Sequence, residues 1–244
     1  MLIDLHAHSA GISTCCKASL TDVIHHAREK DIDGVVLTNH YQKNYLREGE
    51  SPADFAHRYL AEYAFAVVLG KETGFSFFFG IEVTMELYQR VHMLVYGVDG
   101  DFVLQHPTMY DYTQAELYAA VKAAGGTLIQ AHPMRLGYNV LLDTALLDGI
   151  EISNHLRYDG THYEELAAIA HENGLLLTSG GDFHKDTPRP RCGIYLPDEL
   201  QSTREIMAYL HTADRITLCM QECAERPARD EVFCKTAKQA FPHI

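Results

Sequence analysis

The sequence predicts an α/β fold in which parallel strands close into a distorted (βα) barrel, and three observations support this prediction. Short β-rich segments alternate with longer segments of helical periodicity along the whole chain, which is typical of parallel α/β proteins. The strands are continuously apolar, as at Gly34–Leu37, which suits a sheet covered on both faces. No linker interrupts the 244 residues, so we expect one domain over residues 1–244. A closed barrel explains so long a succession better than an open sheet does.

In the first half of the chain, capping residues mark where the predicted helices begin. Ser19 begins a helical segment, and Asp22 three residues later can complete a capping box. Pro52 suits the first position of a long helix that starts at Ser51. We expect helices from 19 to about 30 and from 51 to Gly70 or Gly74, and strands at Leu2–Leu5, Gly34–Leu37, Ser76–Ile81 and Val91–Tyr96, the last two as neighbours or a hairpin.

The second half of the chain repeats the alternation. Gly125 and Gly126 end one predicted helix and Gly174 ends the next, because glycine readily adopts the left-handed conformation that follows a helix. A loop rich in Pro and Arg occupies residues 188–191. We expect helices at Thr113–Ala124, Thr161–Asn173 and Asp198–His211, and strands at Thr127–Gln130, Ile150–Ile152, Leu175–Thr178 and Arg215–Cys219.

Charge and composition limit the partners of the chain. The formal net charge of −13 would repel a phosphate backbone, and no basic stripe is interleaved with aromatics, so extended nucleic acid is not an expected partner. No segment reaches the roughly 18 apolar residues of a membrane helix, and no basic region precedes an apolar run at the N-terminus. We therefore expect a cytoplasmic protein with no membrane partner. Six cysteines in a domain of this size indicate free thiols rather than a disulfide framework. The oligomeric state is not predicted.

The chain has 15 histidines and 33 carboxylates, and the positions of some of them predict a metal site. Neutral imidazole and carboxylate are ligands that divalent transition metals prefer. A His, Asp or Glu follows nearly every predicted strand, and in a parallel barrel the carboxyl ends of the strands open on one face. The residues expected to converge there as metal ligands are His6, His8, His40, Glu82, His92, His132, Asp182 and His184.

Local spacing strengthens this prediction. His6 and His8 lie two residues apart on an extended segment, so their side chains point to the same side, and Asp182 and His184 repeat the arrangement. Glu82 lies beside a strongly apolar strand, where an unpaired carboxylate would be costly to bury. A carboxylate has two oxygens, so this residue could bridge two ions, as in two-metal hydrolytic sites.

These residues resemble the motifs of the PHP family, the polymerase and histidinol phosphatase domains. The matching pieces are Asp4-Leu5-His6-Ala7-His8-Ser9, Leu37-Thr38-Asn39-His40, Gly80-Ile81-Glu82, Val91-His92, Ala131-His132-Pro133 and Gly181-Asp182-Phe183-His184. The resemblance implies a distorted, TIM-like (βα)7 barrel with two or three divalent metal ions, zinc, manganese or iron. It implies one ion on His6, His8, Glu82 and Asp182, a second on Glu82, His92 and His132, and in three-metal members a third on His40, His184 and one further ligand.

The chain departs from the family pattern at the third ion. Residues 9–16 contain no His or Asp that could supply the further ligand. Cys15 or Cys16 could replace it as a thiolate, which would favour zinc, or either could be a structural thiol. Asn39 stands where the family usually has an Asp beside the following histidine, which would weaken the third ion or alter the rate without abolishing the cluster.

The resemblance implies hydrolysis of a small phosphomonoester by metal-activated hydroxide at a dinuclear or trinuclear site. Glu82 and Asp182 are then catalytic through the metal ions, and His155, just after a predicted strand, could protonate the leaving group. Phosphoryl transfer needs positive charge around the phosphate, and several cations follow predicted strands on the presumed metal face. We expect Arg157, Lys185 and Arg135 to bind the substrate, with Arg189 and Arg191 as further candidates.

Two other functions stay open. Metal-bearing barrels of the amidohydrolase type also begin with His-x-His and hydrolyse carbon–nitrogen bonds, although Glu82 here takes the place of their carboxylated lysine. A degenerate barrel that binds metal without turnover would fit Asn39 and the missing ligand. The loops at Tyr41–Gly49 and Gln105–Tyr112 would shape the pocket, and they do not identify the substrate.

Overall fold

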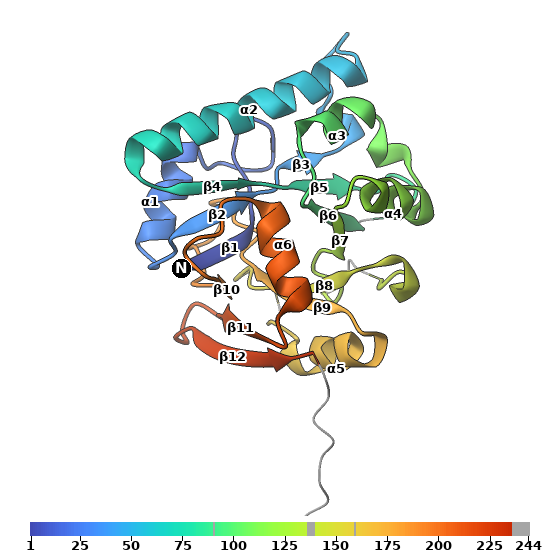
Figure 1. The fold of residues 1–244 in the computed structure, drawn as a ribbon. Helices are drawn as coiled ribbons and strands as arrows, with labels where there is room; N and C mark the ends of the chain where they lie inside the picture. Colours follow the sequence, from blue (N-terminus) through green and yellow to red (C-terminus); the bar gives the residue numbers. More distant parts are fainter. Residues whose placement is uncertain (90, 136–139, 159, 236–244) are drawn as a thin grey trace, which may run out of the picture.

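The computed structural model describes residues 1–244 except 90, 136–139, 159 and 236–244. The described strands form two mixed six-stranded sheets (Figure 1). The first sheet has the order β12 (Arg229–Cys234), β11 (Arg215–Met220), β10 (Gly193–Tyr195), β1 (Leu2–Ala7), β2 (Gly34–Leu37) and β4 (Ser76–Phe79). The second has the order β3 (His40–Tyr41), β5 (Ile81–Thr84), β6 (His92–Tyr96), β7 (Thr127–Gln130), β8 (Gly149–Ser153) and β9 (Leu176–Gly180).

The predicted α/β class agrees with this structure, but the described strands do not close into the predicted (βα)7 barrel. Strand β6 is antiparallel to both β5 and β7, and β10, β11 and β12 also pair antiparallel. The antiparallel pairing of β5 and β6 follows from the length of the connection between them. Only residues 85–91 join β5 to β6, whereas a parallel crossover needs about a dozen residues or more. Between β1 and the segment after β9, the described pairing is a single bridge of Ala7 with Phe183.

The chain passes from one sheet to the other at Gly80, which divides the predicted strand Ser76–Ile81 in two. Strand β4 pairs with β2 in the first sheet, and β5 pairs with β3 in the second. A Cβ atom at position 80 would lie 2.7 Å from Val36 Cγ1 and 2.8 Å from Thr38 Cγ2. Only glycine fits this crossing, so the two sheets approach closely here.

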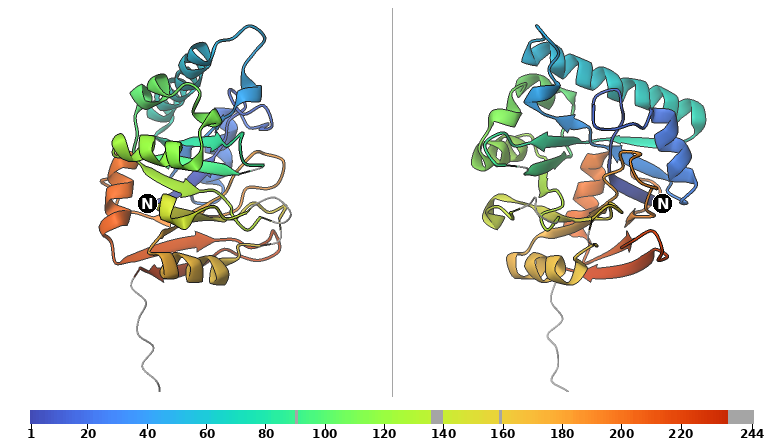
Figure 2. Two further views of the ribbon diagram at one scale, coloured as in Figure 1. Left: turned by 90° about the vertical axis from the view of Figure 1, so that its right-hand side faces the viewer. Right: turned by 180° about the vertical axis from the view of Figure 1, so that it is seen from behind.

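The described part of the chain contains six α-helices, which lie on the outside of the two sheets (Figure 2). Capping boxes begin α1, α2 and α4, where Ser19, Ser51 and Thr113 each accept a hydrogen bond from the backbone three residues later, and these helix starts confirm the sequence prediction. Gly74 and Gly174 end α2 and α5 in the left-handed conformation. The helices are α1 (Leu20–Arg28), α2 (Pro52–Thr73), α3 (Gly100–Gln105), α4 (Gln114–Ala123), α5 (Tyr163–Asn173) and α6 (Thr203–Thr212), with 3-10 turns at Lys43–Tyr45, Met109–Asp111 and Thr144–Leu146.

Several elements differ from the sequence prediction for local reasons. Strand β3 has only two residues, and β12 is an edge strand in which Arg229, Asp230 and Glu231 come in succession, so neither shows an apolar pattern. Helix α6 begins at Thr203 rather than near Asp198, because Ser202 provides the cap. Strand β10 and helix α3 were also not predicted.

The apolar core lies between the two sheets. One buried cluster contains residues of both, among them Ile3, Val36, Ile81, Leu94 and Leu177. A smaller cluster packs α1 against β2 and the first sheet. No helix in the described part of the chain is long and apolar enough to span a membrane. All six cysteines are free thiols.

Candidate metal centre

The predicted ligands gather where the two sheets meet at the ends of β1, β5 and β9. Seven of the eight predicted ligands belong to four overlapping groups, within each of which the ligand atoms lie within 4.8 Å of one another. The eighth, His132, places its Nε2 atom 3.3 Å from the Glu82 carboxylate. The groups are His6, His8, Glu82 and Asp182; His40, Glu82 and His92; His8, His40 and His184; and His155, Asp182 and His184.

Strand β1 and the residue that follows it present His6 and His8 to the cluster. Their Nε2 atoms lie 3.1 Å apart, so both imidazoles point to the same side, as the two-residue spacing predicts. Asp4 fixes the strand beneath them: its carboxylate accepts hydrogen bonds from the backbone N–H of His6 at 3.0 Å and of Gly181 at 2.9 Å. Arg189 donates to the same carboxylate at 2.5 Å, so this candidate phosphate-binding cation is a buried structural partner.

Glu82 on β5 lies at the middle of the cluster. It is fully buried, and its two oxygens face different histidines, which is the arrangement a bridging carboxylate needs. Burial alone would raise the pKa of Glu82, but the imidazoles of His40 and His92 outweigh it and hold that pKa well below its ordinary value. Oε1 lies 2.9 Å from His92 Nδ1 and 3.3 Å from His132 Nε2 and His6 Nε2, and Oε2 lies 2.6 Å from His40 Nδ1 and 3.3 Å from His8 Nε2.

Unusual backbone conformations direct two of the ligands. His132, just after β7, has φ of +33°, and Asp182, just after β9, has φ of +48°. Non-glycine residues seldom adopt positive φ, and such conformations concentrate at functional sites. The backbone N–H of Asp182 also donates to His6 O at 2.8 Å, which ties the end of β9 to β1.

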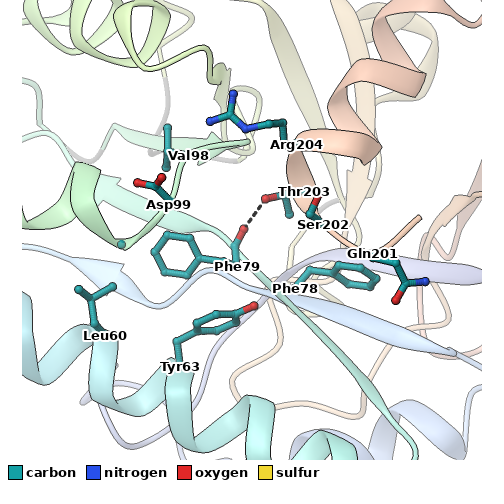
Figure 3. A pocket seen from close by; sticks show the side chains of 11 residues that line it. Leu60, Tyr63, Phe78, Phe79, Val98, Asp99, Gln201, Ser202, Thr203 and Arg204 are labelled. Carbon is teal, nitrogen blue, oxygen red and sulfur yellow. Dashed lines mark hydrogen bonds between the residues drawn. The ribbon is translucent and has the colours of Figure 1, made fainter. Parts of the chain in front are cut away.

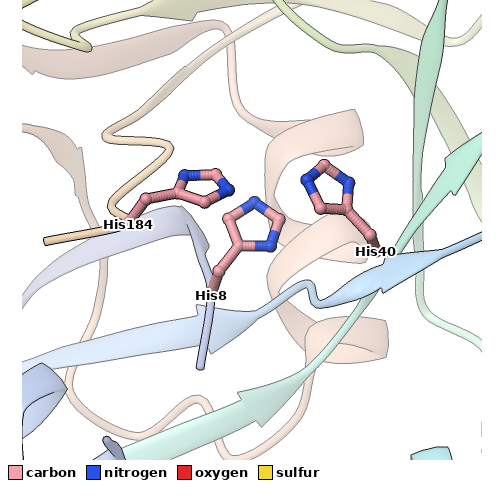
Figure 4. A group of neighbouring side chains, drawn as sticks. All are labelled: His8, His40 and His184. Atoms are coloured by element: carbon pink, nitrogen blue, oxygen red, sulfur yellow. The ribbon is translucent and has the colours of Figure 1, made fainter. Parts of the chain in front are cut away.

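Three imidazoles line one side of the cluster. Figure 4 shows the ring of His8 between those of His184 and His40. The His8 ring centroid lies 4.2 Å from that of His184 and 4.4 Å from that of His40. Burial, followed by the charges of His184 and His40, holds the pKa of His8 well below its ordinary value, which favours the neutral form that binds metal.

The cluster fits divalent metal ions. His40 Nδ1 and Glu82 Oε2 are buried and approach to 2.6 Å, yet neither makes a hydrogen bond of acceptable geometry. Leaving buried polar atoms unsatisfied costs about 1–3 kcal/mol each, and a shared cation would satisfy both. The donors are imidazoles and carboxylates, which suit zinc, manganese and iron.

Hydrogen bonds outside the cluster fix the ring orientation of His6 and His8. Glu151 on β8 is fully buried and accepts a hydrogen bond from His6 Nδ1 at 2.9 Å. Ser13 donates its hydroxyl to Asn39 Oδ1 at 2.9 Å, so at 3.1 Å from His8 Nδ1 it can only accept. Both histidines therefore carry the proton on Nδ1 and direct the Nε2 lone pair into the cluster.

Sequence reasoning did not identify Glu151 or Ser13 as groups that position the ligands. Glu151 interrupts the apolar run of β8, the same signal that identified Glu82, but no motif includes it. Asn39 does not face the cluster. Its amide accepts from Ser9 N–H at 2.7 Å and donates to Ser9 Oγ at 2.9 Å, so it holds the loop that carries Ser13.

The predicted substrate-binding cations lie at different distances from the cluster. Arg135 donates to the Asp182 carboxylate and stacks over the Tyr158 ring, with its guanidinium carbon 4.3 Å from the ring centroid. Arg157 is 60% exposed and pairs with Asp186 at 3.3 Å. Lys185 pairs with Asp22 at the start of α1, with an N–O distance of 2.7 Å. The structure thus brings Arg135 to the cluster and places the other two in ion pairs around it.

His155, the predicted proton donor, is buried beside Asp182 and His184. Its Nε2 atom lies 3.3 Å from Asp186 Oδ1. Burial lowers the pKa of His155, which favours a neutral ring at neutral pH. A neutral imidazole can accept a proton or bind metal, and it is a weaker candidate for protonating a leaving group.

A separate cavity lies away from the histidines. It has a volume of about 330 Å³ and lies between α2, β4 and the start of α6 (Figure 3). Leu60, Tyr63, Phe78 and Phe79 form its apolar wall, and Arg204 lies at its edge. It contains none of the predicted ligands, so it is not the metal centre.

Three solved structures have similar folds. A protein from Bifidobacterium adolescentis whose name reads "putative metal-dependent phosphoesterase" is 19% identical, with a TM-score of 0.54 over 87% of this chain and 96% of that one. An amidohydrolase from Chromobacterium violaceum, with bound sulfate and no metal, is 19% identical, with a TM-score of 0.50 over 85% and 96%. PsfC from Pseudomonas syringae is 14% identical, with a TM-score of 0.51 over 94% and 90%. No family model matches this chain, and no curated protein matches its sequence. At these sequence identities, the similarities concern the fold alone.

Proposed function

We propose that this chain is a metal-dependent hydrolase that acts on a small phosphomonoester. The observation that carries the proposal is the buried Glu82 carboxylate, whose two oxygens face five imidazoles. Its Oε2 atom and the facing His40 Nδ1 atom are both left without hydrogen bonds. The PHP-like motifs favour phosphoester hydrolysis, and the names of two proteins of similar fold, a phosphoesterase and an amidohydrolase, favour hydrolysis in general.

In this proposal Glu82 would help to hold two ions. His6, His8 and Asp182 would hold the first, and His92 and His132 the second, with His40 and His184 available to a third. Divalent ions at such a cluster supply Lewis acidity at the phosphoryl oxygen and a water of lowered pKa. Glu151, Ser13 and Arg135 position the ligands, because each is hydrogen-bonded to one of them.

The protein groups around the cluster would orient the substrate. Arg135 lies against Asp182 and could also contact an oxyanion bound there, because a guanidinium has five N–H donors. Arg157 and Lys185 would have to leave Asp186 and Asp22 to reach the substrate; both ion pairs are partly exposed, and such pairs contribute only about 0–1 kcal/mol. His155, held neutral by burial, suits a role as proton acceptor or metal ligand.

The experiment is a hydrolysis panel with metal-free protein reloaded with zinc, manganese or iron(II). The panel contains aryl, alkyl and nucleoside monophosphates together with carboxamides. We expect phosphomonoester hydrolysis that chelation abolishes and that Glu82→Ala lowers at least 100-fold. Glu86→Ala, an exposed carboxylate in the loop after β5, is the matched control. Turnover of amides alone would identify a carbon–nitrogen hydrolase, metal binding without any turnover would identify a degenerate centre, and hydrolysis by metal-free protein would overturn the proposal.

A further inference from the structure

The imidazole of His8 is connected to helix α2 by a chain of hydrogen bonds. His8 Nδ1 lies 3.1 Å from Ser13 Oγ, and the Ser13 hydroxyl donates to Asn39 Oδ1 at 2.9 Å. The Asn39 amide donates from Nδ2 to Ser9 Oγ at 2.9 Å, and the Ser9 hydroxyl donates to Glu62 Oε1 at 2.6 Å. The two serines and the asparagine are buried, and Glu62 is partly buried on α2. A carboxylate of the outer helix thus ends a chain that begins at a candidate metal ligand.

The backbone fixes the direction of the Asn39 amide in this chain. The N–H of Ser9 donates to Asn39 Oδ1 at 2.7 Å, and a backbone N–H can only donate, so the atom that faces it is the amide oxygen. The Nδ2 group then donates to Ser9 Oγ. Because a hydroxyl has one proton, the Ser9 proton is available to Glu62, which accepts it.

Ser13 transmits this direction to the His8 ring. The Ser13 hydroxyl proton goes to Asn39 Oδ1, and the Ser13 oxygen also accepts from the backbone N–H of His40 at 3.0 Å. A hydroxyl oxygen has two lone pairs, so the one that remains accepts the Nδ1 proton of His8. The neutral His8 ring then carries no proton on Nε2, and this atom faces Glu82 Oε2 at 3.3 Å.

The loop that follows β1 passes directly beside the carboxylate of Glu62. A Cβ atom at Gly11 would overlap this carboxylate, which lies at the end of a flexible side chain. Gly11 does not have a positive φ, so an alanine there would not strain the backbone. The extra methyl group would instead displace the carboxylate from Ser9. Glycine at this position therefore lets α2 reach the chain of hydrogen bonds.

We propose that Glu62 is a positioning residue of the metal centre, which keeps the Nε2 atom of His8 free of its proton through the intervening chain. Without an acceptor at position 62, the amide of Asn39 is no longer held in one direction. A turned amide presents Nδ2 to Ser13, whose hydroxyl then donates to His8 Nδ1. The ring proton moves to Nε2, where it blocks metal binding. The inference rests on the metal binding in the proposed function and is independent of hydrolysis.

The first test is the tautomer of His8 in metal-free protein at neutral pH. Long-range nitrogen–proton correlation spectra distinguish the two neutral tautomers, and His8→Gln identifies the signals of this ring. We expect the Nδ1–H form in the wild type and in Glu62→Gln, whose amide oxygen still accepts from Ser9. Glu62→Leu and Gly11→Ala should both show the Nε2–H form, because each removes the acceptor. Glu72→Leu, at the exposed end of α2, is the matched control and should resemble the wild type.

Zinc affinity provides a second test, measured by competition with a chromophoric chelator. Glu62→Leu should weaken zinc binding about 10-fold, the lower end of what outer hydrogen-bonding partners contribute. In a Ser13→Ala background, Glu62→Leu should cause no further loss, because the chain is already interrupted. Losses that simply add would mean that Glu62 supports the fold in general, and they would overturn the proposal.

The outcomes separate this inference from the proposed function. An unchanged His8 tautomer in Glu62→Leu and Gly11→Ala overturns the positioning role and leaves the hydrolase proposal standing, as does a Glu62→Gln variant that is as impaired as Glu62→Leu. Gly11→Ala decides the question if Glu62→Leu does not fold. Zinc binding without any hydrolysis overturns the hydrolase proposal and leaves this inference standing. Wild-type protein that binds no zinc overturns both.

Discussion

At the scale of single residues, the cluster depends on groups that hold the candidate ligands in place. Glu151 lies behind His6 and accepts the hydrogen bond that keeps the ring in one orientation. Burial raises the pKa of Glu151 despite the opposing effect of His6, yet its two oxygens remain shared between His6 and the backbone N–H of His132. One carboxylate thus positions ligands from β1 and from the segment after β7.

We predict that Glu151→Gln weakens zinc binding about 10–100-fold without unfolding the protein. The amide keeps the size of the side chain but removes the charge that strengthens His6 as a ligand. Affinity is measured by competition with a chromophoric chelator, and circular dichroism monitors the fold. Glu172→Gln, at the exposed end of α5, is the control. Equal zinc affinity in Glu151→Gln and wild type would contradict the positioning role.

At the scale of elements, the centre depends on how closely the ends of β1, β8 and β9 approach. Gly180 ends β9 between them. A Cβ atom there would lie 2.3 Å from Glu151 Oε1 and 2.5 Å from His6 Cβ, and neither neighbour can move without disturbing the cluster. Glycine at this position lets β1 and the segment after β9 bring their ligands together, with Glu151 of β8 behind them.

Gly180→Ala should therefore lower both stability and metal affinity. Forcing extra atoms into a packed interior costs about 1–3 kcal/mol, and here part of that cost displaces His6. Urea denaturation measures the free energy of unfolding, and chelator competition measures affinity. Gly100→Ala is the control, because its Cβ would find the nearest atom at 3.4 Å. If Gly180→Ala is as stable as the control and binds metal with normal affinity, the strand ends can accommodate a Cβ atom and this prediction is wrong.

The start of α2 supports a prediction about pH. The Arg58 guanidinium donates to Glu50 at 2.7 and 2.8 Å, and these hydrogen bonds lower the pKa of Glu50 from 4.5 to about 2. A carboxyl whose pKa is lower in the folded state stabilises the fold above pH 4.5, and this contribution is lost as the pH falls toward about 2.

Glu50→Gln should accordingly be less stable than wild type near pH 6, by up to about 1 kcal/mol. The difference should be smaller near pH 3 and vanish below the folded pKa. Urea denaturation at the two pH values measures it, with the exposed Glu48→Gln as control. A difference that stays constant between these pH values would mean that the ion pair with Arg58 does not cause it.

At the scale of the whole molecule, the centre joins the two sheets. His6 and His8 come from the first sheet and the segment that follows it, whereas His40, Glu82 and His92 belong to the second. Ions bound to both sets would connect the sheets and neutralise carboxylates in a chain of net charge −13.

Metal should for this reason raise the melting temperature. A ligand at 100 times its dissociation constant stabilises the folded state by about 2.7 kcal/mol, which corresponds to roughly 5–10 °C in a domain of this size. Scanning calorimetry of metal-free and zinc-loaded protein measures the shift, and Glu82→Ala should abolish most of it. An equal shift in Glu82→Ala would place the stabilising ion elsewhere.

Much of this molecule could be predicted from local sequence signals. The capping boxes at Ser19, Ser51 and Thr113 specify where three helices start, because a cap needs only residues three apart. The two-residue spacing of His6 and His8 puts both rings on one side of a strand for a similar reason. The eight ligand-type residues do converge as predicted, although the parallel barrel from which that convergence was inferred does not form.

Contacts between distant segments decided the rest. The sequence does not specify that β4 and β5 separate at Gly80 into different sheets, or that Glu151 supports His6. Each depends on which strands pair and how closely their backbones approach, and pairing follows from long-range packing. The residues and their spacing therefore determined the chemistry available to this protein, whereas the tertiary structure decided which side chains position the ligands.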